Sequence, residues 1–488
     1  MKMDKLQKHT DVLIRMGAAS LCVGMSLAAG GGAFGADATP TRQTELLFSF
    51  DTEDFTNPRS WDAAKRLAEM FTEEGITAQF QVVGAVARAL ERNGRKDVIA
   101  AIAKHDIGTH SLNHSVHPDI LELSDGEDYE LAYQRVMAQE SECVGELKRI
   151  FGKDRIWGSN PPGKSESYVA DRVYADLGIR YGVGPHYTDF FDSDIWYGGQ
   201  RRIPYSFSWE NFIAPPTKKD AIRDPAAVVE HLAKVRRGFV FCHPNKVASI
   251  EFWDELNYNG GNYAHWGEWV LSKPRPDEEV ERYLAWIRDI LRRLKADGRF
   301  RFTTVKEIDK LTKPRVAIRL ADIPAIRRHF LTNGLKPIDE PASWCVADVF
   351  CAAVAMLRGE ESFMPDNAYG FLSKPEGVKR SRSVTRCGLV SAAKAMDISK
   401  FLPATIEVEG VRLGPADFLY AALEVLETGA DMVAVEPREQ LGTFRDTPVA
   451  ALENWSYTWL HTPDFKNTHC LDRLRWQLWT LRYEHRSK

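Results

Sequence analysis

Cysteine is scarce in this chain, which has seven cysteines among 488 residues and no Cys-x-x-Cys pair. This wide spacing excludes the disulfide framework of a small secreted domain and a structural zinc site of the Cys-x-x-Cys kind. An excess of one charge is also lacking, because 64 Lys and Arg against 68 Asp and Glu give a formal net charge of −4. That balance gives no sign of a nucleic acid or an anionic membrane as a partner.

One apolar stretch lies near the amino terminus. Residues 1–15 are basic, and residues 16–35 are apolar with many small side chains. The stretch is short and rich in Gly and Ala, which argues against a membrane anchor and predicts a signal peptide, residues 1–35. The mature protein is therefore expected to be secreted or periplasmic, with no membrane anchor. Export permits disulfides, for which the four cysteines nearest the carboxyl terminus are the favoured partners.

The rest of the chain has the pattern of an α/β protein. About 450 residues remain after the signal peptide, enough for two or three domains, and a hydrophobic share of 44% supports a sizeable core. Strand-like runs occur at residues 45–50, 76–83, 107–109, 155–158, 179–184, 239–242 and 300–305, and helical patterns include residues 60–74, 86–104, 129–151, 167–177, 225–236 and 278–296. Their alternation predicts a parallel sheet, and about seven such units are enough to close a barrel.

Candidate metal ligands occur at two places in this α/β region. His110 and His114 are four residues apart, about one helical turn, so one metal ion can accept a nitrogen from each. A carboxylate from Asp51, Glu53 or Asp54 would complete a facial set with positions open for water and a substrate carbonyl. The alternative is that no metal binds: the two histidines lie on a solvent-exposed helix, and the acids cap the next helix. The combination favours the metal, because α/β enzymes place their chemistry at the carboxyl ends of strands.

Two segments resemble motifs of the polysaccharide deacetylases, the family-four carbohydrate esterases with the NodB homology domain. They are residues 50–54, Phe-Asp-Thr-Glu-Asp, and residues 110–114, His-Ser-Leu-Asn-His. The resemblance implies a distorted (β/α)7 barrel in which Asp51 is the catalytic base and His110 and His114 bind a divalent metal, expected to be zinc. The usual family motif has two adjacent aspartates, whereas the acids here are spread, so Glu53 and Asp54 both stay candidates for the third ligand.

A segment rich in Pro and Gly occupies the place of the family's third motif, Arg-x-Pro-x-Gly. Pro162 and Gly163 match it, but Ser159 stands where an arginine that orients the base is expected. Arg201 or Arg202 is a hypothetical substitute in space. By the resemblance, Pro162 and Gly163 are candidate substrate-binding residues, with a backbone N–H of their turn holding the oxyanion. The alternative is an ordinary turn.

Two further segments resemble the fourth and fifth motifs. Residues 191–196 are rich in Asp and end in tryptophan, which makes Asp194 and Trp196 candidate substrate-binding residues, with a surface turn as the alternative. Residues 239–244, Phe-Val-Phe-Cys-His-Pro, read as an apolar strand that ends in histidine. The resemblance assigns His243 as the general acid that protonates the departing amine, whereas a lone histidine is by default a core residue.

An aromatic segment, residues 251–269, follows. Its Trp and Tyr rings with nearby amides suit a sugar, whose C–H face stacks on an aromatic ring while its hydroxyls form hydrogen bonds. Trp253 and Asn257 are therefore candidate substrate-binding residues. Packing of the segment on the barrel is an equal alternative.

The sequence thus predicts three parts. They are a signal peptide at residues 1–35, a deacetylase-like catalytic barrel at residues 42–312 and a mainly helical accessory domain at residues 323–488, for which cell-wall or carbohydrate binding is one candidate role. The expected activity is metal-dependent deacetylation of N-acetylated amino sugars, with an N-acetylated polysaccharide or cell-wall glycan as the partner. The alternatives are hydrolysis of another amide, a cyclic ureide or an O-acetyl ester, and a non-catalytic carbohydrate-binding protein.

Overall fold

The computed structural model describes residues 43–183, 194–258, 268–312, 314–442, 460–461 and 465–483. The predicted signal peptide, residues 1–35, lies outside these ranges, whereas all of them belong to one compact unit. None of the helices in the described ranges combines the length and the apolar character needed to cross a membrane.

Strands and helices alternate through the first two thirds of these ranges. The strands are β1 (Thr44–Thr52), β2 (Gln79–Val82), β3 (Asp106–Thr109), β4 (Tyr181–Val183), β5 (Ile195–Tyr197), β6 (Gln200–Ile203), β7 (Phe207–Ser208), β8 (Arg237–Cys242), β9 (Phe300–Phe302), β10 (Ile318–Arg319), β11 (Ser362–Phe363), β12 (Arg382–Thr385), β13 (Ile406–Val408), β14 (Val411–Leu413), β15 (Met432–Val435) and β16 (Arg482–Tyr483). The α-helices are α2 (Pro58–Glu73), α3 (Gly84–Arg92), α4 (Lys96–Ile102), α5 (Ile120–Ser124), α6 (Tyr129–Phe151), α7 (Tyr168–Asp176), α8 (Pro225–Leu232), α9 (Pro244–Ala248), α10 (Glu255–Tyr258), α11 (Asp277–Ala296), α12 (Val305–Leu311), α13 (Ile323–Asn333), α14 (Val346–Leu357), α15 (Arg386–Ala395), α16 (Pro415–Thr428) and α18 (Thr468–Trp476).

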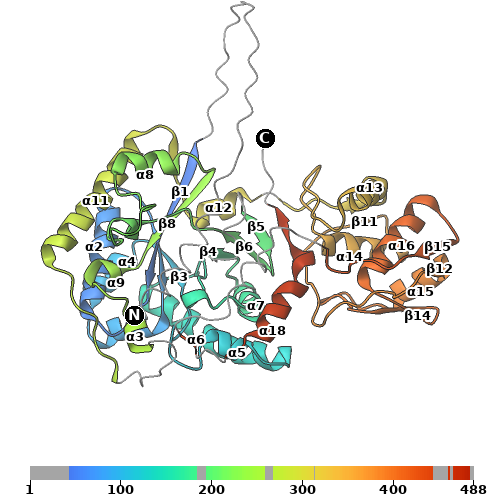
Figure 1. Ribbon diagram of the computed structural model, residues 1–488, viewed down its shortest axis with the longest axis horizontal. Helices are drawn as coiled ribbons and strands as arrows, with labels where there is room; N and C mark the ends of the chain where they lie inside the picture. The colour runs from blue at the N-terminus through green and yellow to red at the C-terminus, as the bar shows by residue number, and fades with distance from the viewer. Residues whose placement is uncertain are drawn as a thin grey trace, which may run out of the picture. The chain divides into compact units, whose positions relative to one another are not determined.

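Strand β1 lies inside a parallel sheet of order β3-β2-β1-β8-β7, to which β9 adds by pairing with β1 (Figure 1). A second path of order β16-β5-β6-β4 contains antiparallel pairs, and Ser159 joins the two paths through single bridges to Thr109 and Gly182. The predicted α/β class with a parallel sheet is confirmed. In the described ranges, however, the strands do not close into the (β/α)7 barrel, because residues 155–158 form no strand and the second path is partly antiparallel.

Local sequence explains where the helices begin and end. The Asp128 side chain accepts a hydrogen bond from the Leu131 N–H at the start of α6, and Gly152 ends that helix in the left-handed conformation at φ 62°. The predicted helix at residues 86–104 is instead two helices, α3 and α4. Gly94, at φ 65°, breaks it because the left-handed backbone cannot continue a helix.

The sheet packs through the aromatic side chains of β1. Phe48 and Phe50 contact the Phe71 ring of α2 with centroids 5.2 and 5.1 Å apart, and all three are at most 2% exposed. In Figure 1, α2, α9 and α11 lie along the side of β1 and β8. This packing fixes the carboxyl ends of both strands, which carry the candidate site.

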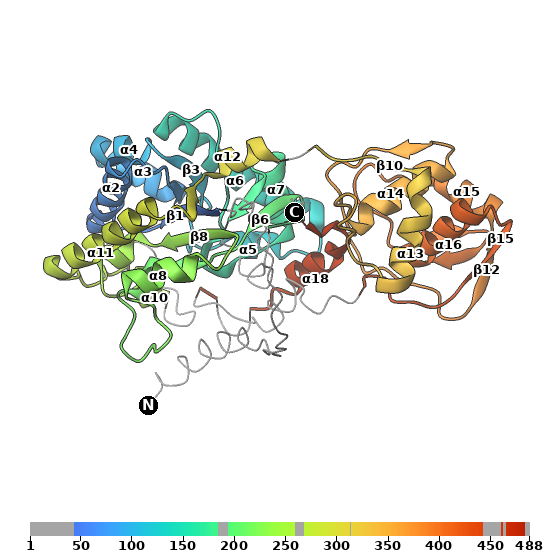
Figure 2. The same ribbon diagram turned by 90° about the horizontal axis from the view of Figure 1, so that it is seen from above.

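The accessory region has a core of its own, built on α13, α14 and α16 (Figure 2). Strands β13 and β14 pair there as an antiparallel hairpin. The carboxy-terminal segment contacts both parts of the chain. Its strand β16 pairs with β5, and Trp479, which is 0% exposed, packs on Phe350 with ring centroids 5.8 Å apart. The six cysteines in the described ranges are all free thiols, so none of the disulfides that export would permit is present there.

Candidate metal centre and catalytic site

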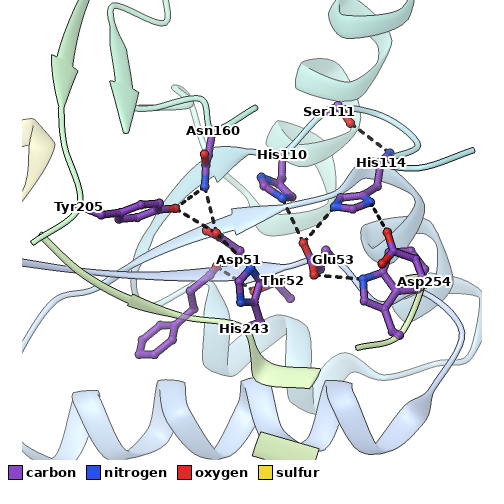
Figure 3. Close-up of polar contacts among 12 residues, drawn as sticks. Asp51, Thr52, Glu53, His110, Ser111, His114, Asn160, Tyr205, His243 and Asp254 are labelled. Carbon is purple, nitrogen blue, oxygen red and sulfur yellow. Dashed lines mark hydrogen bonds and ion pairs between the residues drawn. The ribbon is translucent and has the colours of Figure 1, made fainter. Parts of the chain in front are cut away.

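Three buried acids lie at the carboxyl end of β1. Asp51 belongs to β1, Glu53 and Asp54 follow it, and each of the three is 3% exposed. Strand β1 lies between β2 and β8. Its carboxyl end is therefore next to His243, which follows β8, and is separated by β2 from His110, which follows β3 (Figure 3). This edge of a parallel sheet is where α/β proteins bind ligands.

The two predicted metal histidines lie on the loop after β3 and not on a helix. The backbone N–H of His110 donates to the Val82 carbonyl at 3.1 Å. Ser111 and His114 adopt left-handed φ angles of 66° and 53°, and the Ser111 hydroxyl accepts from the His114 N–H at 3.0 Å. The predicted helical spacing is therefore wrong, since a tight loop brings the two rings to a centroid separation of 5.2 Å. Such non-glycine conformations are unfavourable and concentrate at ligand sites.

Glu53 and the two histidines converge on one point. The Glu53 Oε2 atom lies 3.2 Å from His110 Nε2 and 3.0 Å from His114 Nε2, and the three side chains are at most 3% exposed (Figure 3). One carboxylate oxygen and two imidazole nitrogens are a donor set suited to zinc and related divalent metals. The residues present therefore fit the metal that the family resemblance implies.

The charged groups of this cluster shift one another's pKa values. Burial by itself raises the pKa of Glu53, but the charges of His243 and His114 and the hydrogen bonds from His110 and His114 hold it well below its usual value. Burial lowers the pKa of His114, whereas Glu53 and Asp254 raise it to about 9. A cation bound here would displace imidazole protons, because only an unprotonated nitrogen is a metal ligand.

Asp54, the other candidate for the third ligand, lies outside this cluster. Its Oδ1 accepts from the Thr56 N–H at 2.9 Å, the Thr56 hydroxyl at 2.7 Å and the Asn57 N–H at 3.1 Å. Its Oδ2 accepts from the Ser60 hydroxyl at 2.6 Å. Both oxygens thus hold the turn into α2, which is the capping alternative, and Glu53 is the acid that the structure brings to the histidines.

Asp254 contacts His114 of the cluster, and Trp253 contacts Glu53. Asp254 Oδ2 lies 3.3 Å from His114 Nδ1, with its side chain 0% exposed. Trp253 donates its Nε1–H to Glu53 Oε1 at 3.0 Å. A carboxylate on the second ring nitrogen commonly fixes the tautomer and orientation of a metal-binding histidine. Sequence reasoning did not single out Asp254.

The structure does not place Trp253 or Asn257 where a sugar could bind. Trp253 is 1% exposed and packs on His114, with ring centroids 5.3 Å apart, so it offers no open face. The Asn257 amide donates to the Trp253 and Val270 carbonyls and accepts from the Val270 N–H. Both side chains hold the loop together. The rest of the aromatic segment, residues 259–267, lies outside the described ranges.

Asp51 is held by two neutral donors. Asn160 Nδ2 and the Tyr205 hydroxyl each donate to Asp51 Oδ2 at 3.0 Å, and Asn160 Nδ2 also donates to the Tyr205 oxygen at 2.6 Å (Figure 3). Asp51 Oδ1 is buried with no hydrogen-bond partner in the described ranges. One oxygen of the predicted base is therefore fixed and the other is available.

The segment that resembles the third motif reaches the site through Asn160, not through Ser159. The Ser159 hydroxyl accepts from Gln200 at 3.1 Å. The proposed substitutes for the motif arginine are paired elsewhere, Arg201 with Asp194 and Arg202 with Asp171, so the structure does not support either of them at Asp51.

The turn that follows Asn160 contains the two predicted oxyanion-site residues. Pro162 and Gly163 belong to the short 3-10 helix η1 (Pro162–Lys164), where Gly163 has a φ of 49°. The turn begins two residues after Asn160, whose side chain contacts Asp51. Their role at an oxyanion site stays a prediction.

His243 follows β8 and points toward Asp51. Its Nε2 lies 3.6 Å from Asp51 Oδ2, and its Nδ1 lies 2.6 Å from Glu210 Oε1, which also accepts the His243 backbone N–H at 3.1 Å (Figure 3). Burial lowers the pKa of His243, but the charges of Glu210 and Glu53 and the hydrogen bond to Glu210 raise it to about 10. These neighbours favour the protonated imidazole, which is the form that a general acid needs.

Asp194 and Trp196 lie far from this site. The buried Asp194 carboxylate pairs with Arg201 at 2.9 Å and with Arg237, which also bonds Glu45. Glu45 is near the amino end of β1, about 20 Å along the strand from Asp51 at roughly 3.3 Å per residue. Trp196 carries the Arg482 guanidinium 4.6 Å above its ring. Neither residue lies beside Asp51, and their substrate contacts stay a prediction; residues 184–193 lie outside the described ranges.

A second group of possible ligands, Asp119, Glu122 and His461, occurs after the His110 loop. Asp119 and Glu122 form the capping box of α5, and their oxygens also pair with His461 and His117 at 3.0 and 2.6 Å. These contacts already satisfy the carboxylates, so the group reads as structural.

Comparison with known proteins gives a weak likeness. No family model matches the chain, and no curated protein matches it. Similar solved structures include a family 4 carbohydrate esterase from Bacillus anthracis, at 13% identity, a TM-score of 0.30 and coverage of 55% of this chain and 84% of that chain. A CE4 esterase from Streptococcus mutans has 14% identity, a TM-score of 0.32 and coverage of 54% and 86%.

A CE4 family pseudoenzyme from Bacillus anthracis is also similar, at 10% identity, a TM-score of 0.32 and coverage of 55% and 67%. Because all three TM-scores lie below 0.5, these likenesses carry no conclusion about family or activity. The structure itself defines an α/β protein with a candidate two-histidine, one-carboxylate metal centre at the carboxyl edge of its parallel sheet.

Proposed function

We propose that this protein is a secreted, metal-dependent N-deacetylase that acts on N-acetylated amino sugars of a polysaccharide or peptidoglycan. The observation that carries the proposal is the convergence of Glu53, His110 and His114 beside Asp51 and His243. The set combines a metal position, a base and an acid, which are the groups that amide hydrolysis needs.

Glu53, His110 and His114 would hold a divalent metal, which polarises a carbonyl and lowers the pKa of water. Asp51 accepts the proton of the attacking water at Oδ1, the oxygen with no partner in the described ranges. His243 donates the proton at Nε2 to the departing nitrogen, since Glu210 occupies Nδ1. The water oxygen ends in acetate, and the amine leaves with its added proton.

The second candidate function is hydrolysis of a different bond by the same metal centre, base and acid. Trp253 is buried and Trp196 packs under the Arg482 guanidinium, so neither tryptophan supplies the predicted stacking contact with a sugar. This observation favours testing another amide, a cyclic ureide or an O-acetyl ester. Export is a further part of the proposal, which rests on the sequence of residues 1–35 and is tested by amino-terminal sequencing of the exported chain.

The deciding experiment is acetate release from N-acetylglucosamine oligomers and peptidoglycan by the zinc-loaded mature protein, with O-acetyl esters assayed in parallel. The wild type should release acetate and His114→Ala should not, because loss of a ligand affects turnover and not only KM. Acetate from the esters alone would select the second candidate. Normal turnover by His114→Ala would contradict both candidates.

A further inference from the structure

We propose that Tyr205 and Asn160 are the positioning residues for Asp51. Their catalytic meaning rests on the function proposed above. The geometry that they impose on Asp51 can be tested without it.

The three side chains form a closed hydrogen-bonded triangle. Asn160 Nδ2 has two hydrogens, of which one is directed to Asp51 Oδ2 at 3.0 Å and one to the Tyr205 oxygen at 2.6 Å. The Tyr205 hydroxyl directs its single hydrogen to the same Asp51 Oδ2 at 3.0 Å. Two donors therefore converge on one carboxylate oxygen.

Both donors bind the same oxygen of Asp51. This distinguishes a positioning role from the general need of a buried carboxylate for hydrogen-bond donors. A buried carboxylate whose only need is solvation gains most from donors on both oxygens. Here Asp51 Oδ2 receives both donors, while the buried Oδ1 has no hydrogen-bond partner in the described ranges. Two donors on Oδ2 fix the rotation of the carboxylate, so Oδ1 stays directed to the place where a water proton must be taken.

Both donors are held by the sheet that carries Asp51. The Tyr205 ring stacks on Phe241 with centroids 3.8 Å apart and lies 5.2 Å from the Phe239 ring. Both phenylalanines belong to β8, which pairs with β1. The Asn160 backbone N–H donates to the Thr109 carbonyl at the end of β3 at 3.0 Å. The donors are therefore in place before a substrate binds, which is the condition for an electrostatic contribution without reorganisation.

The test compares Tyr205→Phe and Asn160→Ala with the wild type, all loaded with zinc. Tyr205→Phe keeps the stacked ring and removes only the hydroxyl. Each variant should lower kcat for acetate release about tenfold or more, because a hydrogen bond to a charged group is lost at the base. KM should stay within about twofold and zinc content should be unchanged, since neither side chain contacts Glu53, His110 or His114 in the described contacts.

Tyr181→Phe is the matched control. Tyr181 is also buried, and its hydroxyl donates to Asp309 at 2.9 Å, away from Asp51. This variant should keep kcat within about twofold of the wild type, since it loses a comparable hydrogen bond with no effect on the base. Wild-type kcat in Tyr205→Phe and Asn160→Ala, or an equal loss in Tyr181→Phe, would overturn the proposal and leave the deacetylase function standing.

A thermal double-mutant cycle tests the same geometry independently of activity. If Tyr205 acts on Asp51, the decrease in Tm caused by Tyr205→Phe should be at least halved in an Asp51→Ala background. Additive decreases would overturn the proposal. Should the wild type release no acetate from any substrate, the deacetylase function fails, and this cycle alone decides whether Tyr205 positions Asp51.

Discussion

Replacing Asp254 by asparagine tests whether this buried carboxylate holds His114 in the orientation that a metal needs. Asp254 Oδ2 is 3.3 Å from His114 Nδ1, and the two side chains are 0% and 1% exposed. Asparagine keeps the volume and one acceptor but removes the charge. Loss of such a partner typically weakens metal binding about 10- to 100-fold, or roughly 1.4 to 2.7 kcal/mol. We expect Asp254→Asn near the lower figure and Asp254→Ala near the higher one, because alanine removes both the charge and the oxygen that faces Nδ1.

Competition with a chromophoric chelator measures zinc affinity in the wild type and both variants, with circular dichroism as the check on folding. Asp417→Asn is the matched control, since this carboxylate is also 0% exposed but accepts from Gln440 and the backbone at the start of α16. The control should bind zinc within about twofold of the wild type, because its carboxylate touches no ligand of the metal. Wild-type zinc affinity in Asp254→Ala would refute the reasoning.

Two further predictions concern the carboxy-terminal segment. Trp479→Ala should lower the free energy of unfolding by about 3 to 5 kcal/mol in chemical denaturation, because the ring is fully buried against Phe350, and Trp476→Ala, at a half-buried ring, should lower it less. Burial raises the pKa of Asp119, but its hydrogen bond to His461 lowers the pKa overall. The ionised carboxylate therefore stabilises the folded state above the unfolded pKa, and this stabilisation is lost at lower pH. The difference in unfolding free energy between wild type and Asp119→Asn should therefore shrink from about pH 6 to about pH 3, and a constant or growing difference would contradict it.

The sequence predicts the elements with strong periodicity well. Strand β1 and helix α6 are found where the apolar run at residues 45–50 and the helical pattern at residues 129–151 predict them, because these signals are local. Closure of a barrel is not local. It depends on how the segment around residues 155–159 pairs with the strands on either side of it. In the structure Trp157 and Gly158 form backbone hydrogen bonds to β3, but only Ser159 bridges to both β3 and β4.

The site is predictable where ligands share a short segment and unpredictable where distant segments meet. The structure brings His110 and His114 together, but a loop with two left-handed residues produces the same spacing of four as a helix. Tyr205 and Glu210 carry no motif, since their roles exist only once β8 lies beside β1. Asn160 can be singled out from the sequence in one way, because it directly follows Ser159 in the segment that resembles the third motif.

Asp194 and Trp196 illustrate a limit of prediction from composition. Their segment resembles a pocket motif in composition, but strand β5 runs antiparallel to β6 and joins β16. Asp194 therefore pairs with Arg237 near the amino end of β8, at the edge of the sheet away from Asp51. Composition alone does not tell which end of a sheet a segment reaches.

The central claim is that Glu53, His110 and His114 form one metal centre. Anomalous X-ray scattering at the zinc edge, from crystals of the zinc-loaded protein, tests it directly. We predict a single strong peak within bonding distance of Glu53 Oε2 and the Nε2 atoms of both histidines, at roughly 2.0–2.2 Å. A peak that excludes Glu53, or one at Asp119 and His461 with none at the predicted position, would contradict the account.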